Sequence, residues 1–418
     1  MQHGDALVRK GGTMPTVALV GTLDTKGHEY GFVRDRLREF GTDVLVIDTG
    51  VLDHPLIEAD VSREQVAEAA GADLATLVQE HDRDTAVATM QRGATSIIQK
   101  LVEDGRIHGI LALGGSSGST LASAVMRALP VGFPKFLVST VASGDTRPYV
   151  GTSDIAMMSS IVDISGLNRL SEPILANAAG AISGMAGVYA SFTPSSDARP
   201  LIGATMFGVT TPGVTAARER LEELGYEVLV FHATGIGGDT MEALVQSGLI
   251  TGVLDMTTTE LADFQIGASL PAGPDRLLSA GRVGYPMVVS LGALDMANFG
   301  PFETVPEKFW DRKLFRHNAS VTLMRTTVDE NDDLGRLIAA RLNEATGPVT
   351  VFIPLGGVSM LDVPGQAFHD PEADAALFQS LRDNLDPRVQ VIELDTDIND
   401  PAFAHAMANE LNRLYQNP

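Results

Sequence analysis

Short runs of aliphatic residues recur along the chain, and glycine, aspartate or serine bounds each of them. In the first half they occupy residues 16–20, 43–47, 108–113 and 135–139, with amphipathic or charged stretches between them. Uninterrupted apolar runs of this length are typical of parallel strands that helices cover on both faces. The pattern therefore predicts an α/β fold built on a parallel sheet.

The second half repeats this alternation and extends it. Strands are expected at 201–205, 228–232, 252–256, 287–290, 321–324, 349–353 and 389–394, and helices at 213–224, 240–248, 333–345 and after Asn399. A long excursion at 296–318 interrupts the alternation. Helical patterns also cover 60–104 and 155–190. The second stretch is rich in alanine and glycine, which let helices pack closely, and we expect it to form a dimer interface.

One segment of the chain occurs twice, 184 positions apart. Residues 36–47 share seven of twelve positions with 220–231: Arg36, Leu37, Glu39, Gly41, Val44, Leu45 and Val46 recur as Arg220, Leu221, Glu223, Gly225, Val228, Leu229 and Val230. Each copy has the pattern of a helix end, a glycine stop and a buried strand. The repeat predicts two α/β modules of one topology.

A charged, proline-containing break at Thr193–Pro200 separates the two modules. We therefore expect a tail at 1–13, an N-terminal α/β domain at 14–200 and a C-terminal α/β domain at 201–418. The predicted fold class is α/β, with two Rossmann-like parallel-sheet domains of related topology and a ligand cleft between them. Ligands of open parallel sheets bind at the carboxyl ends of the strands, so the strand-end loops are the place to look for function.

Composition narrows the class of protein further. The chain of 418 residues has no cysteine and a net charge of −23, which excludes disulfides and thiolate chemistry and disfavours a nucleic-acid partner, since no basic stripe is segregated. No apolar stretch reaches the length of about 18 residues that a membrane span needs, and the start lacks an apolar signal core. We expect a cytoplasmic protein with no membrane partner.

The first glycine-rich loop follows the expected strand at 108–113. It reads GGSSGST and consists of Gly114, Gly115, Ser116, Ser117, Gly118, Ser119 and Thr120. Glycines permit close backbone approach, and a following helix offers free amides and a positive dipole end, so the loop suits a phosphate or carboxylate. It is not a Walker A loop, because no Gly-Lys-Ser/Thr ends it. The alternative is a tight turn with a Ser or Thr helix cap.

Two more loops of the first module lie at equivalent strand ends. The first carries Asp24, Thr25 and Lys26 within GTLDTKG at 21–27, and the second carries Ser143, Gly144, Asp145 and Arg147. An arginine can grip a phosphate or carboxylate through two hydrogen bonds. Arg147 has an equally good alternative role in a salt bridge to Asp145 or Asp154.

The second module offers similar turns. Gly235, Gly237 and Gly238 lie in HATGIGGDT at 232–240, and Thr257, Thr258 and Thr259 lie in MTTTEL at 256–261. Each motif is weak alone, because α/β turns are commonly built this way. Together, at the strand ends of two modules, they predict several anion-binding turns that converge on one crevice.

Acidic side chains also follow the expected strands, namely Asp24, Asp145, Asp255 and Asp295. A pair of them could hold Mg²⁺, as phosphate sites often require, although helix capping and turn formation are their ordinary uses. The nine histidines show no metal-ligand spacing, so a zinc site is not expected. No catalytic set can be assembled from residue spacing, and a nucleophilic Ser116 or Ser117 is not favoured.

Long runs of this chain resemble the UPF0261 family, the family of the ATP-binding domain of the tomato mosaic virus resistance protein Tm-1. The resemblance rests on LDTKG, GGSSGST, NAAGAISGMAG, VLVFHATGIGG, VLDMTTTEL, GALDMANFG, HNASVTLMRTT, PLGGVSMLD and INDPAFA, and it extends from Thr16 to Ala404. It implies two Rossmann-like subdomains, a homodimer, and ATP bound in the inter-domain cleft by the loops named above. The antiviral role belongs to a plant setting and is not carried over.

Three functions remain open at this point. The first is an ATP-dependent enzyme of small-molecule metabolism that uses Mg²⁺, with Lys26 and Arg147 on the phosphates. The second is a nucleotide-responsive module that binds a protein partner through the charged 55–104 region and catalyses nothing. The third is an enzyme that acts on a small phosphorylated or carboxylated metabolite.

Overall fold

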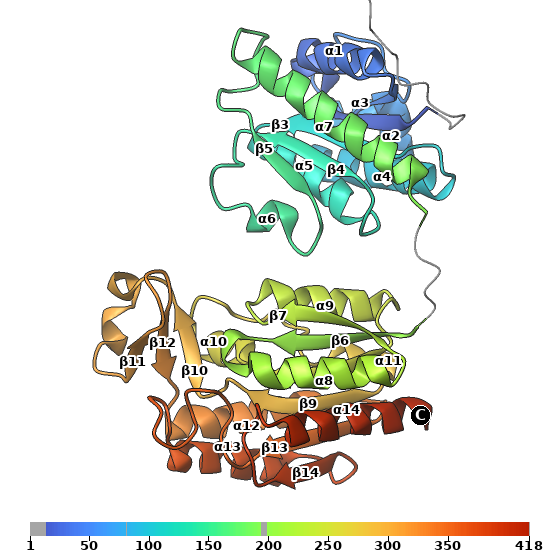
Figure 1. Ribbon diagram of the computed structural model, residues 1–418. Coiled ribbons are helices and arrows are strands. Elements are labelled where there is room, and N and C mark those ends of the chain that lie inside the picture. The colour runs from blue at the N-terminus through green and yellow to red at the C-terminus, as the bar shows by residue number, and fades with distance from the viewer. Residues whose placement is uncertain (1–13, 81, 194–198, 418) are drawn as a thin grey trace, which may run out of the picture. The chain divides into compact units, whose positions relative to one another are not determined.

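A parallel sheet flanked by helices forms each half of the chain, which divides into two compact units, residues 1–195 and 196–418. The computed structural model describes residues 14–80, 82–193 and 199–417. The predicted tail at 1–13 and most of the predicted boundary stretch therefore lie outside the described residues. The predicted α/β class with two parallel-sheet domains is confirmed (Figure 1).

The first unit contains a five-stranded sheet in the order β2-β1-β3-β4-β5, with every pairing parallel. Its strands are β1 (Thr16–Gly21), β2 (Asp43–Asp48), β3 (Gly109–Gly114), β4 (Lys135–Ser139) and β5 (Ala156–Ser159). This is the flavodoxin-like order, in which β2 lies on one side of β1 and β3 lies on the other. The strand order reverses at β1, and this reversal opens a crevice between β1 and β3. The switch point of the unit therefore lies between the loops that follow these two strands.

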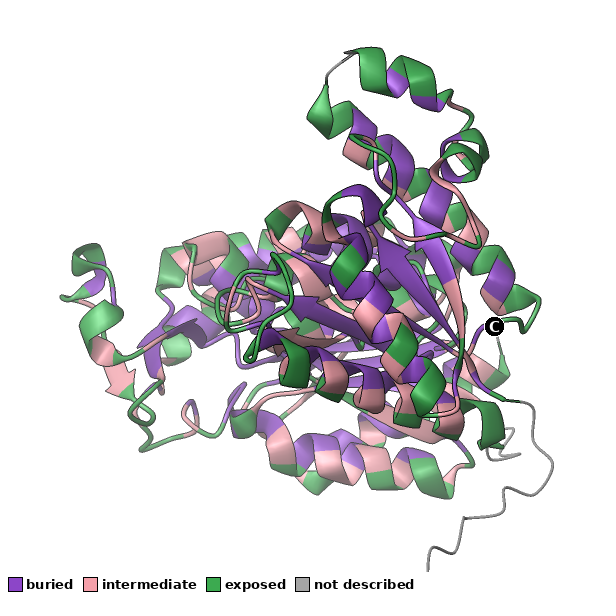
Figure 2. Cartoon of the chain, turned by 90° about the horizontal axis from the view of Figure 1, so that it is seen from above, coloured by how far each residue is buried: buried purple, intermediate pink, exposed green. Residues whose placement is uncertain are grey.

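Helices cover both faces of this sheet. One face packs against α1 (Leu23–Glu39) and α7 (Ser171–Ser191), and the other against α2 (Arg63–Ala69), α3 (Leu74–Glu80), α4 (Arg83–Glu103) and α5 (Ser116–Arg127). A short α6 (Arg147–Val150) follows β4. Figure 2 shows the strands buried, while the helices alternate between buried and exposed positions. Such alternation is the mark of helices that pack one side against a sheet.

The expectation of one helical stretch at 155–190 is wrong for residues 155–170. Residues 156–159 form β5, which pairs with β4, and the helix begins only at Ser171. Pairing with an open sheet edge overrides the helix propensity of the alanine and methionine residues here, because strand formation depends strongly on context.

Helix α7 also corrects the expectation that no stretch is long and apolar enough to cross a membrane. Among the described residues it alone meets that criterion by length and composition, with a hydropathy of 1.2 over its most apolar window. Its inner face packs on the sheet through Leu175, Ala178 and Ile182.

The second unit repeats the topology of the first and adds a strand. Its sheet has the order β14-β13-β9-β8-β6-β7. The strands are β6 (Leu201–Met206), β7 (Glu227–His232), β8 (Gly252–Thr257), β9 (Met287–Gly292), β13 (Val349–Pro354) and β14 (Gln390–Leu394), all parallel. The corresponding switch point lies between β6 and β8.

The repeated sequence segment forms the same element in both units. Helix α1 ends before Gly41 and β2, and α8 (Thr211–Glu223) ends before Gly225 and β7. The two glycines have φ values of 72° and 94°, which L-residues with a side chain adopt only with strain. The sequence identity therefore reflects a shared helix stop followed by an equivalent strand.

The remaining helices of the second unit also form two layers. They are α9 (Ile236–Gln246), α10 (Glu260–Ile266), α11 (Ser279–Val283), α12 (Val328–Asn343), α13 (Pro371–Asn384) and α14 (Pro401–Gln416). Helices α8 and α14 pack on one face, and α9, α12 and α13 on the other. The sequence pattern did not predict α13. The sequence does contain two signals for its start, namely Pro371 at the first helical position and Asp370 as the cap.

The excursion at 296–318 contains part of a separate sheet. Strands β10 (Met296–Phe299), β11 (Leu314–Arg316) and β12 (Thr322–Arg325) pair antiparallel in the order β10-β12-β11. The strand predicted at 321–324 is therefore real, but it belongs to this small sheet and not to the parallel one.

Candidate functional site at the strand ends

A buried tyrosine separates the carboxyl ends of β1 and β3 in the first unit. The Tyr30 hydroxyl donates to the Val20 carbonyl at 2.6 Å and accepts the Leu113 amide at 2.8 Å. A β-carbon added to Gly21 would lie 1.9 Å from this hydroxyl, so only glycine fits there. Burial raises the pKa of Tyr30, which keeps the phenol protonated. The tyrosine thus satisfies the ladder groups where the two strands part at the switch point.

The glycine-rich loop at 114–120 turns directly into α5. Gly115 is the N-cap and supplies no side-chain cap, and the first bond of the helix runs from the Ser119 amide to the Gly115 carbonyl at 2.8 Å. The amides of Ser116, Ser117 and Gly118 donate to no acceptor among the described residues. A helix start leaves such amides free for an anion. The alternative of a Ser or Thr cap on this helix is not what the structure contains.

The hydroxyls of this loop divide between packing and surface. Ser119 shares a buried hydrogen bond with Ser139 at 2.6 Å, and Thr120 donates to the Ser116 carbonyl at 2.9 Å. Arg83, from the start of α4, donates to Ser117 Oγ at 3.2 Å. This places a guanidinium next to the free amides, a neighbour that the sequence pattern did not identify.

Gly114 and Gly115 have different roles. A β-carbon at Gly114 would lie 2.7 Å from backbone atoms of Gly118 and Ser119, so this glycine lets the turn close on itself. A β-carbon at Gly115 meets only Thr140 Oγ1, at 3.8 Å. The second glycine is therefore not required by packing, and the space beside it is open.

The loop at 21–27 belongs to the same sheet edge. Lys26 leaves helical geometry within α1, and its Nζ donates to the Ile164 carbonyl at 2.5 Å. Thr25 is exposed and shares a hydrogen bond with Thr22, whereas Asp24 is buried and accepts the Leu52 amide at 2.8 Å. Of these three residues, the lysine brings positive charge to the strand ends.

The third loop of the first unit holds its charges in a pair. Arg147 donates twice to Asp145, with both contacts at 2.9 Å, and both side chains are exposed. This is one of the two salt bridges considered from the sequence; Asp154 instead pairs with the fully buried Lys135. Ser143 and Gly144 are exposed beside the pair. The loop is accessible, but its arginine already has an acidic partner.

The glycine loop of the second unit is filled by the protein's own carboxylate, which differs from the expected cradle for an external anion. The amides of Gly235 and Gly238 donate to Glu260 Oε1 at 2.7 and 3.1 Å. Gly237 packs against the His232 carbonyl, because a β-carbon added to this glycine would lie only 1.8 Å from the carbonyl oxygen. The physical reason is simple: Glu260, in the first turn of α10, reaches back and occupies the amides that a ligand would need.

The threonines after β8 are also internal. Thr257, Thr258 and Thr259 are fully buried. Thr257 Oγ1 bonds to Thr210 Oγ1 at 2.7 Å, and Thr258 Oγ1 donates to the Ser290 carbonyl at 3.2 Å. In this conformation their hydroxyls hold strand ends together, and none of them faces solvent.

A buried guanidinium organises this part of the second unit. Arg276 is 0% exposed and contacts Glu260 at 2.6 Å, Asp255 at 2.7 Å and Glu242 at 3.5 Å. Burial raises the pKa of Glu242 and that of Glu260. Asp255, one of the four acids of which a pair could hold Mg²⁺, is thus neutralised by an arginine and accepts the Thr205 hydroxyl as well.

Asp295 lies in a second buried acidic cluster. It accepts the Ser359 hydroxyl at 2.8 Å, and Arg325 pairs with the neighbouring Asp362 and Asp374. Burial raises the pKa of Asp295 to about 6. The side chain is 0% exposed and lies among groups of its own unit, so it faces no open space in which an external Mg²⁺ ion would bind.

Asp263 makes the stability of the protein depend on pH. Its Oδ1 accepts hydrogen bonds from the backbone amide of Asn298 at 2.7 Å and from the side-chain amide of the same residue at 3.0 Å. Burial nevertheless raises the pKa of Asp263 to about 7. A folded-state pKa above the unfolded value of 3.8 contributes stability that is complete below about pH 4 and is lost as the pH rises through 7. We expect urea unfolding to show a free energy that falls by up to about 4 kcal/mol from pH 4 to 8 through this group. The Asp263→Asn variant, although less stable, should show a smaller slope over that range; an unchanged slope would assign the titration elsewhere.

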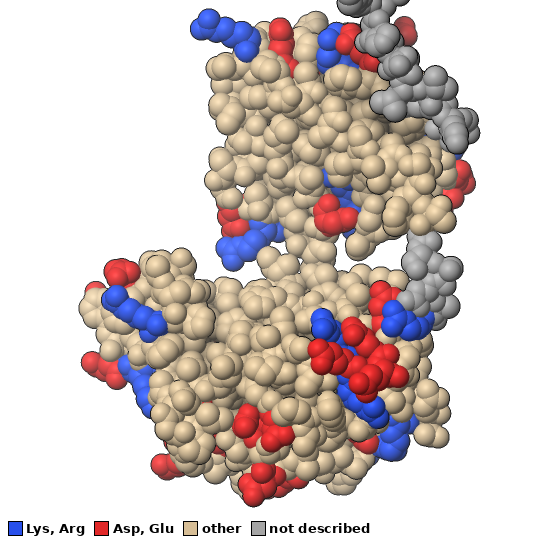
Figure 3. All heavy atoms as spheres, in the orientation of Figure 1, with Lys and Arg blue, Asp and Glu red and all other residues tan. Residues whose placement is uncertain are grey.

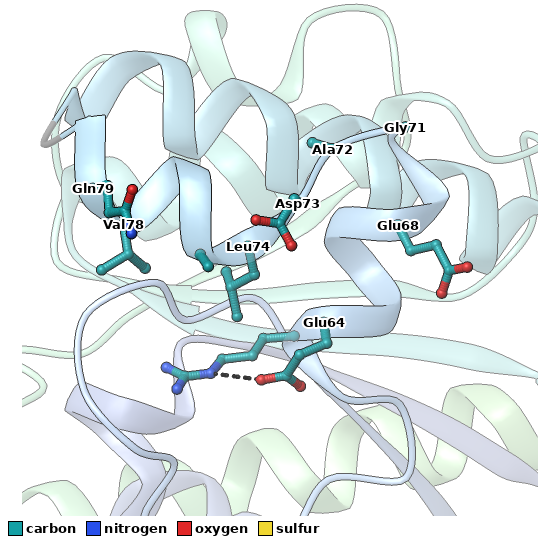
Figure 4. Close-up of a pocket in the computed structure, with 10 residues that line it drawn as sticks. Glu64, Glu68, Gly71, Ala72, Asp73, Leu74, Val78 and Gln79 are labelled. Atoms are coloured by element: carbon teal, nitrogen blue, oxygen red, sulfur yellow. Dashed lines mark hydrogen bonds and ion pairs between the residues drawn. The ribbon is translucent and has the colours of Figure 1, made fainter.

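A hollow lies elsewhere in the first unit. It has a volume of 780 Å³ and is lined by residues of α2, α3 and the turn between them, with Glu64, Glu68 and Asp73 around it (Figure 4). None of the three strand-end loops lines it. On the face drawn in Figure 3, basic and acidic residues are interspersed. Within the described residues no group of three or more His, Cys, Asp or Glu is placed to hold a metal.

Two family models match the chain over nearly its whole length. Residues 15–191 match the UPF0261 N-terminal domain, and residues 199–415 match the UPF0261 C-terminal domain, both of a protein family described as uncharacterised. The chain belongs to the UPF0261 family.

Other members of UPF0261 align along almost all of the chain. A UPF0261 protein of Clostridium tetani is 50% identical over 94% of this chain and 98% of its own. The UPF0261 protein RA0729 of Rhizobium meliloti is 47% identical over 94% and 97%. The tomato mosaic virus (ToMV) resistance protein Tm-1(GCR237) of Solanum lycopersicum is 40% identical over 94% of this chain, which spans 55% of that longer protein.

Solved structures add little. A UDP-N-acetylglucosamine 2-epimerase from Rickettsia bellii covers 96% of each chain at 9% identity, with a TM-score of 0.24. A score this low supports no conclusion about function.

Proposed function

We propose that the protein binds ATP through its phosphates at the carboxyl edge of the first unit's sheet. The observation that carries this proposal is the set of uncapped amides of Ser116, Ser117 and Gly118 at the start of α5. They lie on one side of the switch point between β1 and β3, where ligands of this fold class bind. ATP itself is what the UPF0261 resemblance implies.

Positive charge near these amides supports an anionic ligand. Arg83 touches Ser117, and Lys26 lies near the start of α1, across the switch point. With a net charge of −23 on the chain, long-range attraction does not favour ATP. Local amides and cations must therefore supply the affinity, because fixed donors act strongly at contact distance.

The first unit is favoured over the second because its loop is empty of protein groups. In the second unit Glu260 already accepts the amides of Gly235 and Gly238. Displacing a buried carboxylate that is paired with Arg276 would cost several kcal/mol, on the order of the penalty for breaking a buried pair.

Lys26 provides the first test. In Lys26→Ala we expect ATP affinity, measured by calorimetry, to fall by about 1.5–3 kcal/mol, the scale of a hydrogen bond to a charged group. The matched control is Lys100→Ala, because Lys100 pairs loosely with Asp104 on the exposed end of α4. Wild-type protein that does not bind ATP at all would refute the proposal, and equal affinity of Lys26→Ala would remove this lysine from the site.

Catalysis remains a separate proposal. Incubation with ATP and Mg²⁺, with and without candidate carboxylic acids, distinguishes an ATP-dependent enzyme from a nucleotide-responsive binding module. Release of ADP or AMP supports the enzyme; saturable binding without turnover supports the binding module.

A further inference from the structure

We propose that the first unit holds a divalent cation of the Mg²⁺ type, ligated by Asp24, Asp48 and Thr49. The inference deepens the proposed function, because the site adjoins the loop that carries Lys26. It depends on that function for its purpose and not for its structural evidence.

Two aspartates brace the same pair of loops. Asp48, the last residue of β2, accepts the Leu23 amide at 3.1 Å and the Gly50 amide at 2.8 Å, both through Oδ1. Asp24 accepts the Leu52 amide at 2.8 Å through Oδ2. A β-carbon on Gly50 would lie 2.7 Å from the Asp24 carboxyl carbon. The loop after β1 and the loop after β2 are therefore in contact at these two side chains.

The second oxygen of each aspartate has no partner. Asp24 Oδ1, Asp48 Oδ2 and the hydroxyl Oγ1 of the adjacent Thr49 are buried without a hydrogen bond among the described residues. The three residues are 8%, 1% and 2% exposed. Buried polar atoms are almost always satisfied, and each exception needs an explanation such as an ion or water. Helix capping accounts for the bonded oxygens only, so it leaves these three unexplained.

The negative charge of Asp24 and Asp48 favours a cation over a neutral molecule such as water as their missing partner. Arg63 lies near Asp48, but it donates to the Asp53 carbonyl and pairs with Glu64. Lys26 donates to the Ile164 carbonyl. In the described part of the chain neither Asp24 nor Asp48 has a basic side chain in an ion pair. Burial of unpaired carboxylates is costly unless a cation compensates them.

The kind of donor selects the ion. Carboxylate and hydroxyl oxygens suit Mg²⁺ and Mn²⁺, and Mg²⁺ is usually held by one or two carboxylates, with waters and substrate phosphates completing its shell. Two aspartates and one threonine on the segments that follow β1 and β2 fit that description, whereas a nitrogen- or sulfur-preferring metal would find no ligand among these three side chains.

The test uses Mn²⁺ alone on the full chain, without nucleotide, followed by the loss of its free-ion electron paramagnetic resonance signal. We expect one strong Mn²⁺ site per chain. Asp48→Asn should weaken it at least about tenfold, the loss caused even by residues that only orient metal ligands. Thr49→Val, which keeps the shape and removes only the hydroxyl, should weaken it to a lesser degree. Glu39→Gln is the matched control, because Glu39 is an exposed acid of the same unit that pairs with Arg36 at the end of α1.

Several outcomes would overturn the site. They are absence of Mn²⁺ binding in the wild type, unchanged binding in both Asp48→Asn and Thr49→Val, or an equal loss in Glu39→Gln. Circular dichroism identifies a variant that fails to fold, and Thr49→Val then decides the question. ATP affinity measured in excess chelator tests the phosphate site independently. Mn²⁺ binding without ATP binding supports the cation site and refutes the proposed function; the reverse result refutes the cation site alone.

Discussion

Replacement of Arg276 by methionine is expected to lower the free energy of unfolding by about 3–5 kcal/mol at pH 8, the cost of removing one partner from a buried ion pair. Methionine fills much of the same volume, so the cost is mainly electrostatic. Asp255, Glu260 and Glu242 would remain buried without the guanidinium that now contacts all three. Urea unfolding followed by circular dichroism measures the change.

The pH dependence separates this mechanism from simple loss of packing. Without Arg276, Glu242 and Glu260 favour protonation in the folded state even more than they do now, because burial already raises the pKa of each. Folded-state pKa values above the unfolded ones give stability that is lost as the pH rises. The deficit of Arg276→Met should therefore shrink from pH 8 to pH 5. Arg147→Met, which breaks an exposed pair, should leave stability unchanged. A deficit that is the same at both pH values would contradict the electrostatic account.

Replacement of Gly115 by valine is expected to weaken ATP binding by about 2–3 kcal/mol, roughly 30- to 150-fold in Kd, while the fold stays intact. The backbone of Gly115 is extended, with φ at −76°, and a β-carbon there meets only Thr140 Oγ1 at 3.8 Å. The valine methyl groups would instead project beside the free amides of Ser116 and Ser117, where the phosphates are proposed to lie.

The second unit offers a matched control for this substitution. Gly208 lies two residues after β6, the counterpart of β1 in the second unit, and a β-carbon there meets nothing within 4 Å. Calorimetry should show normal ATP affinity for Gly208→Val. If Gly208→Val abolished binding and Gly115→Val did not, the nucleotide site would belong to the second unit.

Local sequence pattern predicts most elements of this fold because each buried strand is a short apolar run with a glycine or acid at its end. The repeat around Gly41 and Gly225 predicts shared topology for the same reason: both glycines stop a helix at positive φ. The errors arise where pairing partners are distant. β5 forms because β4 offers an open edge, and the strand at Thr322–Arg325 joins β10 and β11, which no local pattern reveals.

The candidate site divides along the same line. The loops after β1 and β3 could be located from the sequence, because a glycine-rich turn before a helix is a local signal. Which loops the protein fills with its own side chains could not be predicted from the sequence. Arg276 lies in a proline-flanked loop and meets acids 16, 21 and 34 positions earlier in the chain. Asp48 ends a strand like many turn acids, and only the packing of Gly50 and Leu23 reveals its unpaired oxygen.

The carboxylate of Glu260 acts as a resident counter-ion for the backbone of its own unit. Two halves of common design have thus diverged: one stabilises a glycine-rich turn with an internal negative charge, and the other has a glycine-rich turn, after a different strand, whose amides donate to no carboxylate among the described residues. Such a difference turns a symmetrical scaffold into one with a single receptive side. The chain would then bind one ligand molecule although it contains two similar sheets. The second unit, whose turn Glu260 fills, would serve as a rigid, preformed support.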